Sequence, residues 1–389
     1  MRILHIMDYY VPNLGYQENY LPFIQRELGH EVGIITSNFI PKKRRIYTKN
    51  FKKEKNEFIH NNVKIYRLKS WFSIEKMGRT VIKNLANKIK EFNPDVIHSH
   101  GLYTYGSIIS LKIVKKTNIK LFIDIHIDND NFHPDGLFKK TYIWLFNRFF
   151  LEDLKKYTIL FLPVNPFAKK YLINNLGINQ SKVQLLPLGV DGLKFFPNNK
   201  KIKKIRNELN LKKKDFVIIS SGMFNNNKDI DILVQSIYKL SQNHSNIKLL
   251  LLGSGPNEYM TKIGNLVNIY KLENKVIFHD FIEHSILSDY YNASDLGVFP
   301  GKLGITTIEA VATGLPVIVC KNDATEFIIQ NNNGLSFKRG DVEELTQKIR
   351  EYINNPTKRK KHKQNAVQLV ENKLSWKKIA ERSIEIYRE

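Results

Sequence analysis

The residues with the clearest chemical potential lie between Phe299 and Phe337, FPGKLGITTIEAVATGLPVIVCKNDATEFIIQNNNGLSF. A short apolar run enters a glycine turn, and residues 306–313 have a helical pattern that ends at Gly314. A helix start presents unpaired backbone N–H groups and the positive end of the helix dipole. Four amides at this start could therefore hold a diphosphate: Leu303, Gly304, Ile305 and Thr306. Glu309, in the first turns of the helix, could accept hydrogen bonds from a ribose.

A lysine lies in a second loop of the same half. Residues 216–221 form an apolar run, and the loop that follows begins at Gly222 and ends at Lys228. An isolated lysine before a helix is usually surface decoration, but its spacing from Gly222 and its pairing with Glu309 favour contact with a diphosphate. Phe281 follows another apolar run, 276–278, and its loop should open at the same sheet edge, where backbone groups could read a base.

Three groups of residues in the first half are also expected to lie at a sheet edge. Gly15 and Tyr16 lie in the loop between the first strand and the first helix, where ligands of such folds usually bind, and a simple turn is the alternative. His126 ends the apolar strand 121–125. His98 and His100 alternate along an extended segment and so face one side. Nothing in the sequence supplies further metal ligands, so we interpret this pair as sheet-edge structure and predict no metal site.

These residues must be positioned by strands that alternate with helices, the pattern of parallel sheets covered on both faces. The alternation begins at residues 2–7 and restarts at 216–221, and 389 residues suffice for two domains. The fold class is therefore α/β. Residues 142–150, YIWLFNRFF, are rich in aromatics. Because Leu145, Phe146, Phe149 and Phe150 recur at helical spacing, we predict a buried helix rather than membrane insertion.

The chain is strongly basic, with 61 Lys and Arg residues against 37 Asp and Glu, a formal net charge of +24. The segment Lys42 to Lys55 has eight basic residues, with Ile46, Tyr47 and Phe51 between them, and could lie on an anionic membrane surface. Solvated lysines are the plainer alternative. No helix-turn-helix, zinc or stacking module accompanies the charge, so we expect no nucleic-acid partner.

Location follows from what the sequence contains. No run approaches the roughly 20 apolar residues of a membrane span, and Met1 to Met7 is too short and strand-like for a secretion signal. The single cysteine, Cys320, cannot form an internal disulfide and agrees with a reducing compartment. We therefore expect a cytoplasmic protein, with peripheral contact on the inner face of the cell membrane.

The sequence resembles the family-four retaining glycosyltransferases of the group 1 type. Their usual pattern, P-S-x-x-E-G-F-G-x-x-x-x-E-A-M-A-x-G-x-P-V-V, is matched here by Gly304, Glu309, Ala310, Ala312, Gly314, Pro316 and Val317. Residues 188–191, LGVD, match the interdomain segment N-G-V-D. The resemblance implies GT-B architecture: two facing Rossmann-like domains with parallel sheets and a C-terminal helix that crosses back to the first domain. The implied boundaries are 1–188, 189–373 and 374–389.

The resemblance also implies site roles. His126 would face the donor sugar with help from Asp128, Lys228 would bind the diphosphate, and Glu309 would bind the ribose. Two family features differ here. Eight positions before Glu309, Gly301 replaces a glutamate that contacts the donor sugar, and Met223 replaces an arginine on the diphosphate. Amides near Lys302 and Leu303 would then have to help hold the sugar.

The implied activity is transfer of a sugar, with retention, from a UDP- or GDP-sugar to a hydroxyl of a glycan or lipid-linked acceptor, in cell-surface polysaccharide or glycolipid synthesis. The nucleotide-diphosphate sugar is the co-substrate, and no cofactor is required. Two alternatives remain open: a degenerate nucleotide-sugar-binding subunit that needs a partner, and a nucleotide-sugar 2-epimerase.

Overall fold

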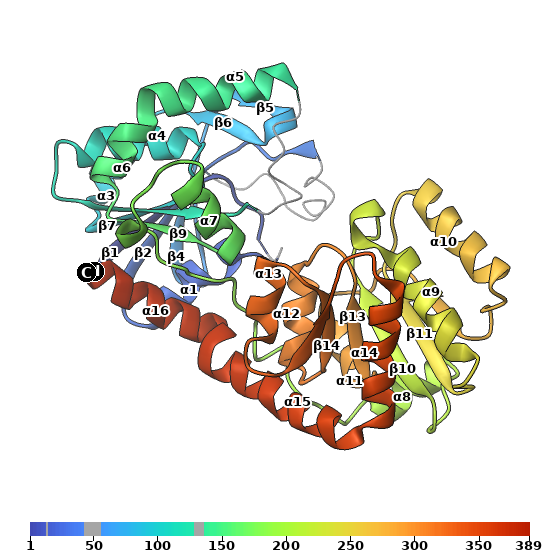
Figure 1. Ribbon diagram of the computed structural model, residues 1–389. Coiled ribbons are helices and arrows are strands. Elements are labelled where there is room, and N and C mark those ends of the chain that lie inside the picture. Colours follow the sequence, from blue (N-terminus) through green and yellow to red (C-terminus); the bar gives the residue numbers. More distant parts are fainter. Residues whose placement is uncertain (13–14, 43–55, 128–135) are drawn as a thin grey trace. The chain divides into compact units, whose positions relative to one another are not determined.

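The computed structural model describes residues 1–12, 15–42, 56–127 and 136–389, and the chain forms two compact units (Figure 1). Unit 1 comprises Met1–Leu188 and Trp376–Glu389, and unit 2 comprises Gly189–Ser375. The final segment was expected to begin at residue 374. It begins at Trp376, because the N–H of Val190 donates to the carbonyl of Leu374 at 2.8 Å and holds that residue in unit 2.

Unit 1 is built on a seven-stranded sheet in the order β3-β4-β2-β1-β7-β8-β9, parallel throughout except for β3 against β4. The central strands are buried on both faces, as expected when helices cover a parallel sheet, and they carry the buried polar residues His5, His98, Ser99 and Asp124 as well as apolar ones. The strands are β1 (Arg2–Tyr9), β2 (Glu31–Ser37), β3 (Glu57–His60), β4 (Val63–Leu68), β7 (Val96–His100), β8 (Lys120–Ile125) and β9 (Leu160–Pro163). A separate hairpin pairs β5 (Ser70–Ile74) with β6 (Arg79–Ile82).

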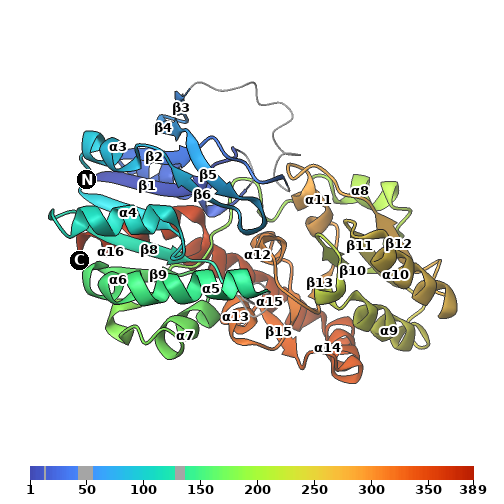
Figure 2. The same cartoon turned by 90° about the horizontal axis from the view of Figure 1, so that it is seen from above.

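The helices of unit 1 cover the two faces of this sheet (Figure 2). They are α1 (Leu21–Glu27), α3 (Leu85–Phe92), α4 (Tyr105–Val114), α5 (Leu137–Phe146), α6 (Glu152–Tyr157), α7 (Pro166–Asn174) and α16 (Trp376–Arg388), with the short turns η1 (Gln17–Asn19), η3 (Glu75–Met77), η4 (Asn147–Leu151) and η5 (Gln180–Lys182). The last helix, α16, packs beside α1, and Trp376 stacks on Tyr20 with ring centroids 5.3 Å apart. The C-terminal segment therefore completes the core of unit 1.

Unit 2 has a six-stranded, wholly parallel sheet in the order β12-β11-β10-β13-β14-β15. Its strands are β10 (Phe216–Ser221), β11 (Ile247–Leu252), β12 (Val276–His279), β13 (Leu296–Phe299), β14 (Val317–Cys320) and β15 (Gly334–Phe337). The helices are α8 (Ile202–Glu208), α9 (Ile230–Ser241), α10 (Asn257–Ile269), α11 (Leu287–Asn292), α12 (Ile305–Ala312), α13 (Asp323–Glu326), α14 (Val342–Asn354) and α15 (Pro356–Leu369), with η6 (Asn226–Lys228), η7 (Phe327–Ile329) and η8 (Val370–Leu374). The chain order reverses between β10 and β13, which is where ligands of such sheets bind.

The aromatic segment is a helix, α5 followed by the π-helical turn η4, but the prediction that it is buried is wrong for most of its large side chains. Phe146 is buried and meets Tyr103 at a centroid distance of 5.0 Å. Leu145 and Phe149 are exposed, and Phe150 is only partly buried. Helical spacing identified one face correctly, but the other apolar face lies on the surface of unit 1.

No helix in the described part of the chain is long and apolar enough to cross a membrane. The predicted membrane-facing segment, Lys42 to Lys55, lies outside the described residues apart from Lys42, as does Asp128.

Candidate active site

The start of helix α12 supplies the backbone groups predicted to hold a diphosphate. Gly304 is its N-cap residue, in an extended conformation (φ −129°, ψ 178°), and as a glycine it has no side chain to cover the amides of the first turn. The hydroxyl of Thr306 donates to the carbonyl of Ser221 at 3.4 Å and so ties this helix start to the end of β10. Ile305 and Thr306 therefore lie at the switch point of the sheet.

Glu309 is the most informative side chain of unit 2. It is only 2% exposed, and its Oε1 lies 2.6 Å from Nε2 of His284. Its Oε2 is buried and has no hydrogen-bond partner among the described residues. A buried carboxylate oxygen without a partner is costly, and such groups are rare outside functional sites. Glu309 is therefore placed to accept a hydrogen bond from a ligand hydroxyl.

His284 was not predicted from the sequence. It belongs to the loop that follows β12, the same loop that carries Phe281, and its ring packs on Phe195 with centroids 5.1 Å apart. The imidazole thus anchors one oxygen of Glu309 and leaves the other for a ligand. The sequence did offer a signal for this residue: it is a histidine three positions after Phe281, in a loop expected at the carboxyl edge of the parallel sheet.

Lys228 lies beside the start of α12. Its Nζ donates to the carbonyl of Lys302 at 2.6 Å, and a Cβ placed on Gly304 would lie 3.6 Å from that Nζ. The ammonium group, Gly304 and the first amides of the helix thus form one positively polarised corner. This corner could stabilise negative charge that develops on a departing diphosphate.

The loop around Gly301 explains why no carboxylate stands there. A Cβ on Gly301 would lie 2.2 Å from the carbonyl oxygen of Asn227 and 2.6 Å from the carbonyl carbon of Lys228. The N–H of Lys302 also donates to Asn227 at 2.7 Å. The two loops are in backbone contact, so no side chain fits at 301. The amide of Lys302 is already used, which corrects the expectation that it helps to hold a sugar and leaves Leu303 for that role.

We expect Gly301→Ala to lower the free energy of unfolding by about 1 to 3 kcal/mol, because the added methyl group would force the two loops apart. Thermal melting should show this as a lower Tm, and donor binding should weaken as Lys228 moves. Gly264→Ala on α10 is the matched control, since nothing lies within 4 Å of a Cβ there. Equal Tm values for both variants would contradict the packing described here.

The remaining donor-side residues lie on loops that follow β10 and β12. Gly222 has φ +122°. A Cβ placed on Gly253 would lie 2.0 Å from the carbonyl oxygen of Gly222, so the loops after β10 and β11 are also in backbone contact. Phe281 is 58% exposed, and Met223, at the position of the family's arginine, is exposed as well. Phe281 is thus available to stack on a base.

In unit 1, His126 lies next to a buried carboxylate. Its Nε2 is 3.2 Å from Oδ2 of Asp124, the residue two positions earlier on β8. The side chain of His126 is 40% exposed. Partial desolvation would lower its pKa, but the charge and hydrogen bond of Asp124, with a further contribution from the charge of Glu18, outweigh this effect and hold the pKa above its ordinary value. Burial would likewise raise the pKa of Asp124, and the charges of His100 and His126 hold it well below its ordinary value. The pair therefore favours an imidazolium next to a carboxylate.

Asp124 also organises the histidines of β7. Nε2 of His98 and Nδ1 of His100 lie 3.3 and 2.7 Å from its Oδ2. Nε2 of His100 lies 2.9 Å from Nδ1 of His5, and Nε2 of His5 lies 2.7 Å from Oε1 of Gln25. The rings of His98 and His100 stack at 4.7 Å, as expected for residues on one side of a strand. Asp124 was not predicted from the sequence. The available signal was its position two residues before His126, which places both side chains on the same face of an extended strand.

The ligand atoms of His98, His100 and Asp124 lie within 4.8 Å of one another, which is close enough to consider a metal ion. Both histidines already contact Oδ2 of Asp124 through one ring nitrogen each. We interpret the cluster as a hydrogen-bond network that positions His126, and the absence of a metal site stays a prediction.

We expect Asp124→Asn to lower the pKa of His126, because the neighbouring negative charge that raises it is lost. The raised pKa means that protonated His126 stabilises the folded protein below about pH 6.5, and that this stabilisation disappears as the pH rises through the folded-state pKa. Titration of the histidine ring protons by NMR measures the shift directly. Glu18→Gln should cause a smaller decrease, and an unchanged pKa in Asp124→Asn would exclude this pairing.

Gly15 and Tyr16 lie just before η1. Gly15 has φ +77°, and the carbonyl of Tyr16 accepts from the N–H of Asn19 at 2.9 Å. The turn also brings Glu18 close enough to influence His126. The loop is therefore near His126 of the same unit, and contact of Gly15 and Tyr16 with a phosphate stays a prediction.

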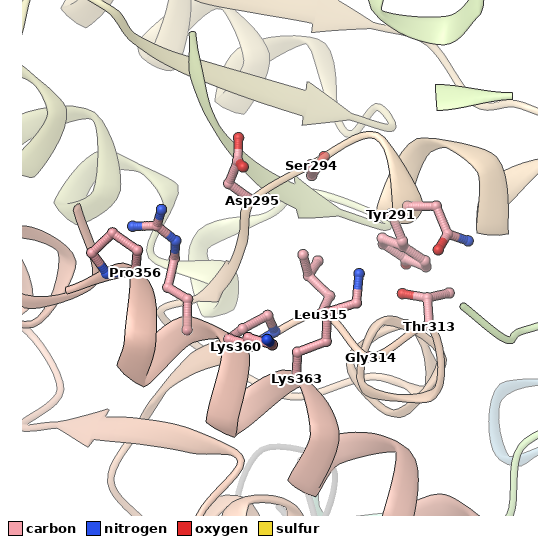
Figure 3. A pocket seen from close by; sticks show the side chains of 12 residues that line it. Tyr291, Ser294, Asp295, Thr313, Gly314, Leu315, Pro356, Lys360 and Lys363 are labelled. Carbon is pink, nitrogen blue, oxygen red and sulfur yellow. The ribbon is translucent and has the colours of Figure 1, made fainter. Parts of the chain in front are cut away.

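A hollow lies elsewhere in unit 2, beside Lys360 and Lys363 of α15 (Figure 3). It is lined at the opposite end of α12 by Thr313, Gly314 and Leu315. Cationic side chains near a helix C-terminus are favourable on structural grounds alone. We therefore keep the candidate site at the start of α12.

Comparisons with known proteins identify the family and the fold class of the chain. Residues 201–369 match the family "Glycosyl transferases group 1", and residues 25–192 match "Glycosyltransferase Family 4". The chain belongs to these group 1 glycosyltransferases, and its two Rossmann-like units are of the GT-B fold class.

Three relatives illustrate the range of similar proteins. The alpha-monoglucosyldiacylglycerol synthase of Acholeplasma laidlawii is 22% identical over 376 residues, 88% of each chain. The capsular polysaccharide biosynthesis glycosyltransferase CapM of Staphylococcus aureus is 29% identical over 230 residues, 56% of this chain and 58% of the relative. Among solved structures, Anabaena Alr3699/HepE in complex with UDP has a TM-score of 0.75 at 16% identity, with 99% of each chain covered.

Proposed function

We propose that this protein is a retaining glycosyltransferase that moves a hexose from a UDP- or GDP-sugar to a hydroxyl of a glycan or lipid-linked acceptor. The observation that carries the proposal is the buried, unpartnered Oε2 of Glu309 on the same short helix whose start lies beside Lys228. A carboxylate for ribose hydroxyls and a cationic corner for a diphosphate are the two things a nucleotide-diphosphate donor requires.

The proposed chemistry is mainly electrostatic. As the bond between the anomeric carbon and the diphosphate breaks, negative charge grows on the diphosphate oxygens. Lys228 and the amides of Ile305 and Thr306 are the groups that would stabilise it, while Glu309 fixes the ribose. His126, which lies beside Asp124, would hydrogen-bond a sugar hydroxyl. Displacement on one face needs no protein nucleophile, and the proposal includes no cofactor.

The relatives guide the choice of donor and acceptor. Solved structures of Anabaena Alr3699/HepE contain UDP or UDP-glucose, which favours UDP here. Relatives include a glucosyldiacylglycerol synthase and a capsular polysaccharide enzyme, which favours a lipid-linked or glycan acceptor in cell-surface synthesis. We accordingly propose a cytoplasmic protein that works at the inner face of the cell membrane.

The donor half of the proposal is tested by thermal melting with UDP, GDP, CDP and ADP, followed by the sugar conjugates of the nucleotide that responds. A ligand at 100 times its dissociation constant stabilises the protein by about 2.7 kcal/mol, a readily visible shift. We expect UDP or GDP to respond. If no diphosphate nucleotide raises the Tm, with or without a divalent ion, the donor-site assignment fails.

The second candidate is a sugar-nucleotide-binding subunit that needs a partner, motivated by Met223 and Gly301. The tight backbone packing at Gly301 weakens this alternative. The loop at this position is well packed around a glycine, so the absence of a carboxylate there does not indicate that the site has lost its function. Product formation by the purified protein alone separates the two. Conversion of the nucleotide sugar without transfer would instead identify a 2-epimerase.

A further inference from the structure

The C-terminal helix reaches the histidine network of unit 1 through two polar side chains. Ser383 and Tyr387 stand one turn apart on the same face of α16 and are 0% and 1% exposed. The hydroxyl of Tyr387 contacts Nδ1 of His98. The amide nitrogen of Gln25 donates to the hydroxyl of Ser383 at 2.8 Å and to that of Tyr387 at 3.4 Å. These buried contacts connect α16 with the cluster that ends at His126.

The contacts of Ser383 set the direction of one hydrogen-bonded path. Its hydroxyl donates to the carbonyl of Ala380 at 2.7 Å, so its single proton is used and it accepts from Gln25. That orientation of the amide turns Oε1 of Gln25 toward His5, whose Nε2 must donate to it at 2.7 Å. Burial holds the pKa of His5 well below its ordinary value, so the ring is neutral and its Nδ1 accepts from Nε2 of His100.

This first path reaches Asp124 through His100. Nδ1 of His100 lies 2.7 Å from Oδ2 of Asp124, and because a carboxylate only accepts, this nitrogen also carries a proton. His100 is therefore a donor at both ring nitrogens, in keeping with its charge interaction with Asp124. The serine of α16 thus determines, four contacts away, which groups donate along the path.

A second path runs from Tyr387 to the same carboxylate through His98. Nε2 of His98 lies 3.3 Å from Oδ2 of Asp124 and must donate to it, which leaves Nδ1 to accept from the hydroxyl of Tyr387. Burial lowers the pKa of His98, in agreement with a neutral ring that has one proton. The N–H of Gly101 donates to the other oxygen of Asp124 at 2.8 Å. Both paths from α16 therefore converge on Oδ2 of Asp124.

We propose that Tyr387 and Ser383 are positioning residues for the ring of His126. That ring is the exposed end of the network: its Nε2 lies 3.2 Å from Oδ2 of Asp124, and 40% of the side chain is exposed, whereas Asp124 is fully buried. By fixing the histidines that hold Asp124, α16 fixes the carboxylate and with it the ring that would contact the donor sugar. The two residues of α16 act through Asp124 and touch no substrate. The inference rests on the proposed function for the sugar contact of His126.

Nitrogen-15 NMR of the histidine rings in the full chain tests the donor order. A protonated and an unprotonated ring nitrogen differ widely in chemical shift, so the spectrum identifies the tautomer. We expect the single proton of the neutral rings of His5 and His98 to be on Nε2. A proton on Nδ1 of His98 would overturn the proposal, because the hydroxyl of Tyr387 could not then donate to that ring.

Tyr387→Phe tests the positioning, because it keeps the ring that packs on Phe122 at a centroid distance of 4.8 Å and removes only the hydroxyl. We expect the contact between Asp124 and His126 to loosen, which lowers the pKa of His126 toward its ordinary value. The kcat for release of UDP from UDP-glucose should fall about tenfold or more, with the Kd of UDP unchanged within about twofold.

Tyr352→Phe in unit 2 is the matched control for this variant. The hydroxyl of Tyr352 contacts Nδ1 of the buried His362 at 2.8 Å, so the substitution removes the same kind of hydrogen bond from the other unit. It should leave the pKa of His126 unchanged. A parental pKa of His126 in Tyr387→Phe would contradict the proposal, and so would an equal change in Tyr352→Phe.

Ser383→Ala tests the first path. It frees the amide of Gln25 to turn, so the pKa of His126 should fall in the same direction as in the tyrosine variant. Ser110→Ala is its control and should leave that pKa unchanged, because the buried hydroxyl of Ser110 donates to the carbonyl of Gly106 within α4 at 2.7 Å. Equal values in the two serine variants would exclude the path through Gln25. The histidine titration needs no nucleotide, so it decides this proposal even if UDP fails to raise the Tm and the donor site is wrong.

Discussion

Glu309→Ala is expected to abolish most donor binding while leaving the unliganded protein at least as stable as the parent. The carboxylate is buried with one oxygen unpartnered among the described residues, so its removal relieves a desolvation cost in the free protein. In the complex the same oxygen would accept a ribose hydroxyl. We expect a loss of about 2 to 4 kcal/mol in transition-state stabilisation, with weaker nucleotide binding as part of it.

Calorimetric titration with the responding nucleotide measures this loss, and melting curves without nucleotide serve as the stability control. His284→Asn provides a graded comparison, because it disturbs the anchor of Oε1 but keeps the carboxylate. Normal nucleotide affinity in Glu309→Ala would remove Glu309 from the donor site.

Lys228→Ala is expected to reduce kcat about 100- to 1,000-fold with a smaller effect on nucleotide affinity. The contact strengthens as charge develops on the leaving diphosphate, so its energy appears mainly in the transition state. No arginine stands at Met223 to share this task, which makes the dependence on Lys228 larger. Steady-state kinetics on Lys228→Ala and Lys228→Arg separate charge from geometry, and Lys213→Ala is an exposed control.

A partial recovery in Lys228→Arg would support the role of positive charge. Equal losses in kcat and in the affinity for free nucleotide would instead show uniform binding of the diphosphate and would contradict a role in leaving-group stabilisation.

Much of the fold could be predicted from the sequence because many of its strands are short, mostly apolar runs that alternate with helical segments. Residues 216–221 and 317–320 are buried on both faces, and their loops converge on one edge. Gly304 and Glu309 were recognisable because a glycine turn, a helix and a carboxylate stand at a fixed spacing. These features are local, so a single sequence displays them.

The parts that could not be predicted depend on contacts between distant segments. His284 meets Glu309 across 25 positions, and Gly301 is enclosed by the backbone of residues 227–228. The exposure of Leu145 and Phe149 was missed for a related reason. Periodicity shows that a helix has an apolar face, but only the tertiary structure shows whether another element covers it.

The most direct test of the central claim is NMR of the purified protein with the nucleotide sugar that raises its Tm, following the anomeric proton of the first sugar product. No acceptor needs to be added if the measurement follows slow hydrolysis of the donor, in which water takes the place of the acceptor hydroxyl. The account predicts release of the nucleoside diphosphate together with a sugar that first appears in the donor's anomeric configuration, and loss of both in Lys228→Ala. A product of inverted configuration, or an intact donor despite tight binding, would contradict it.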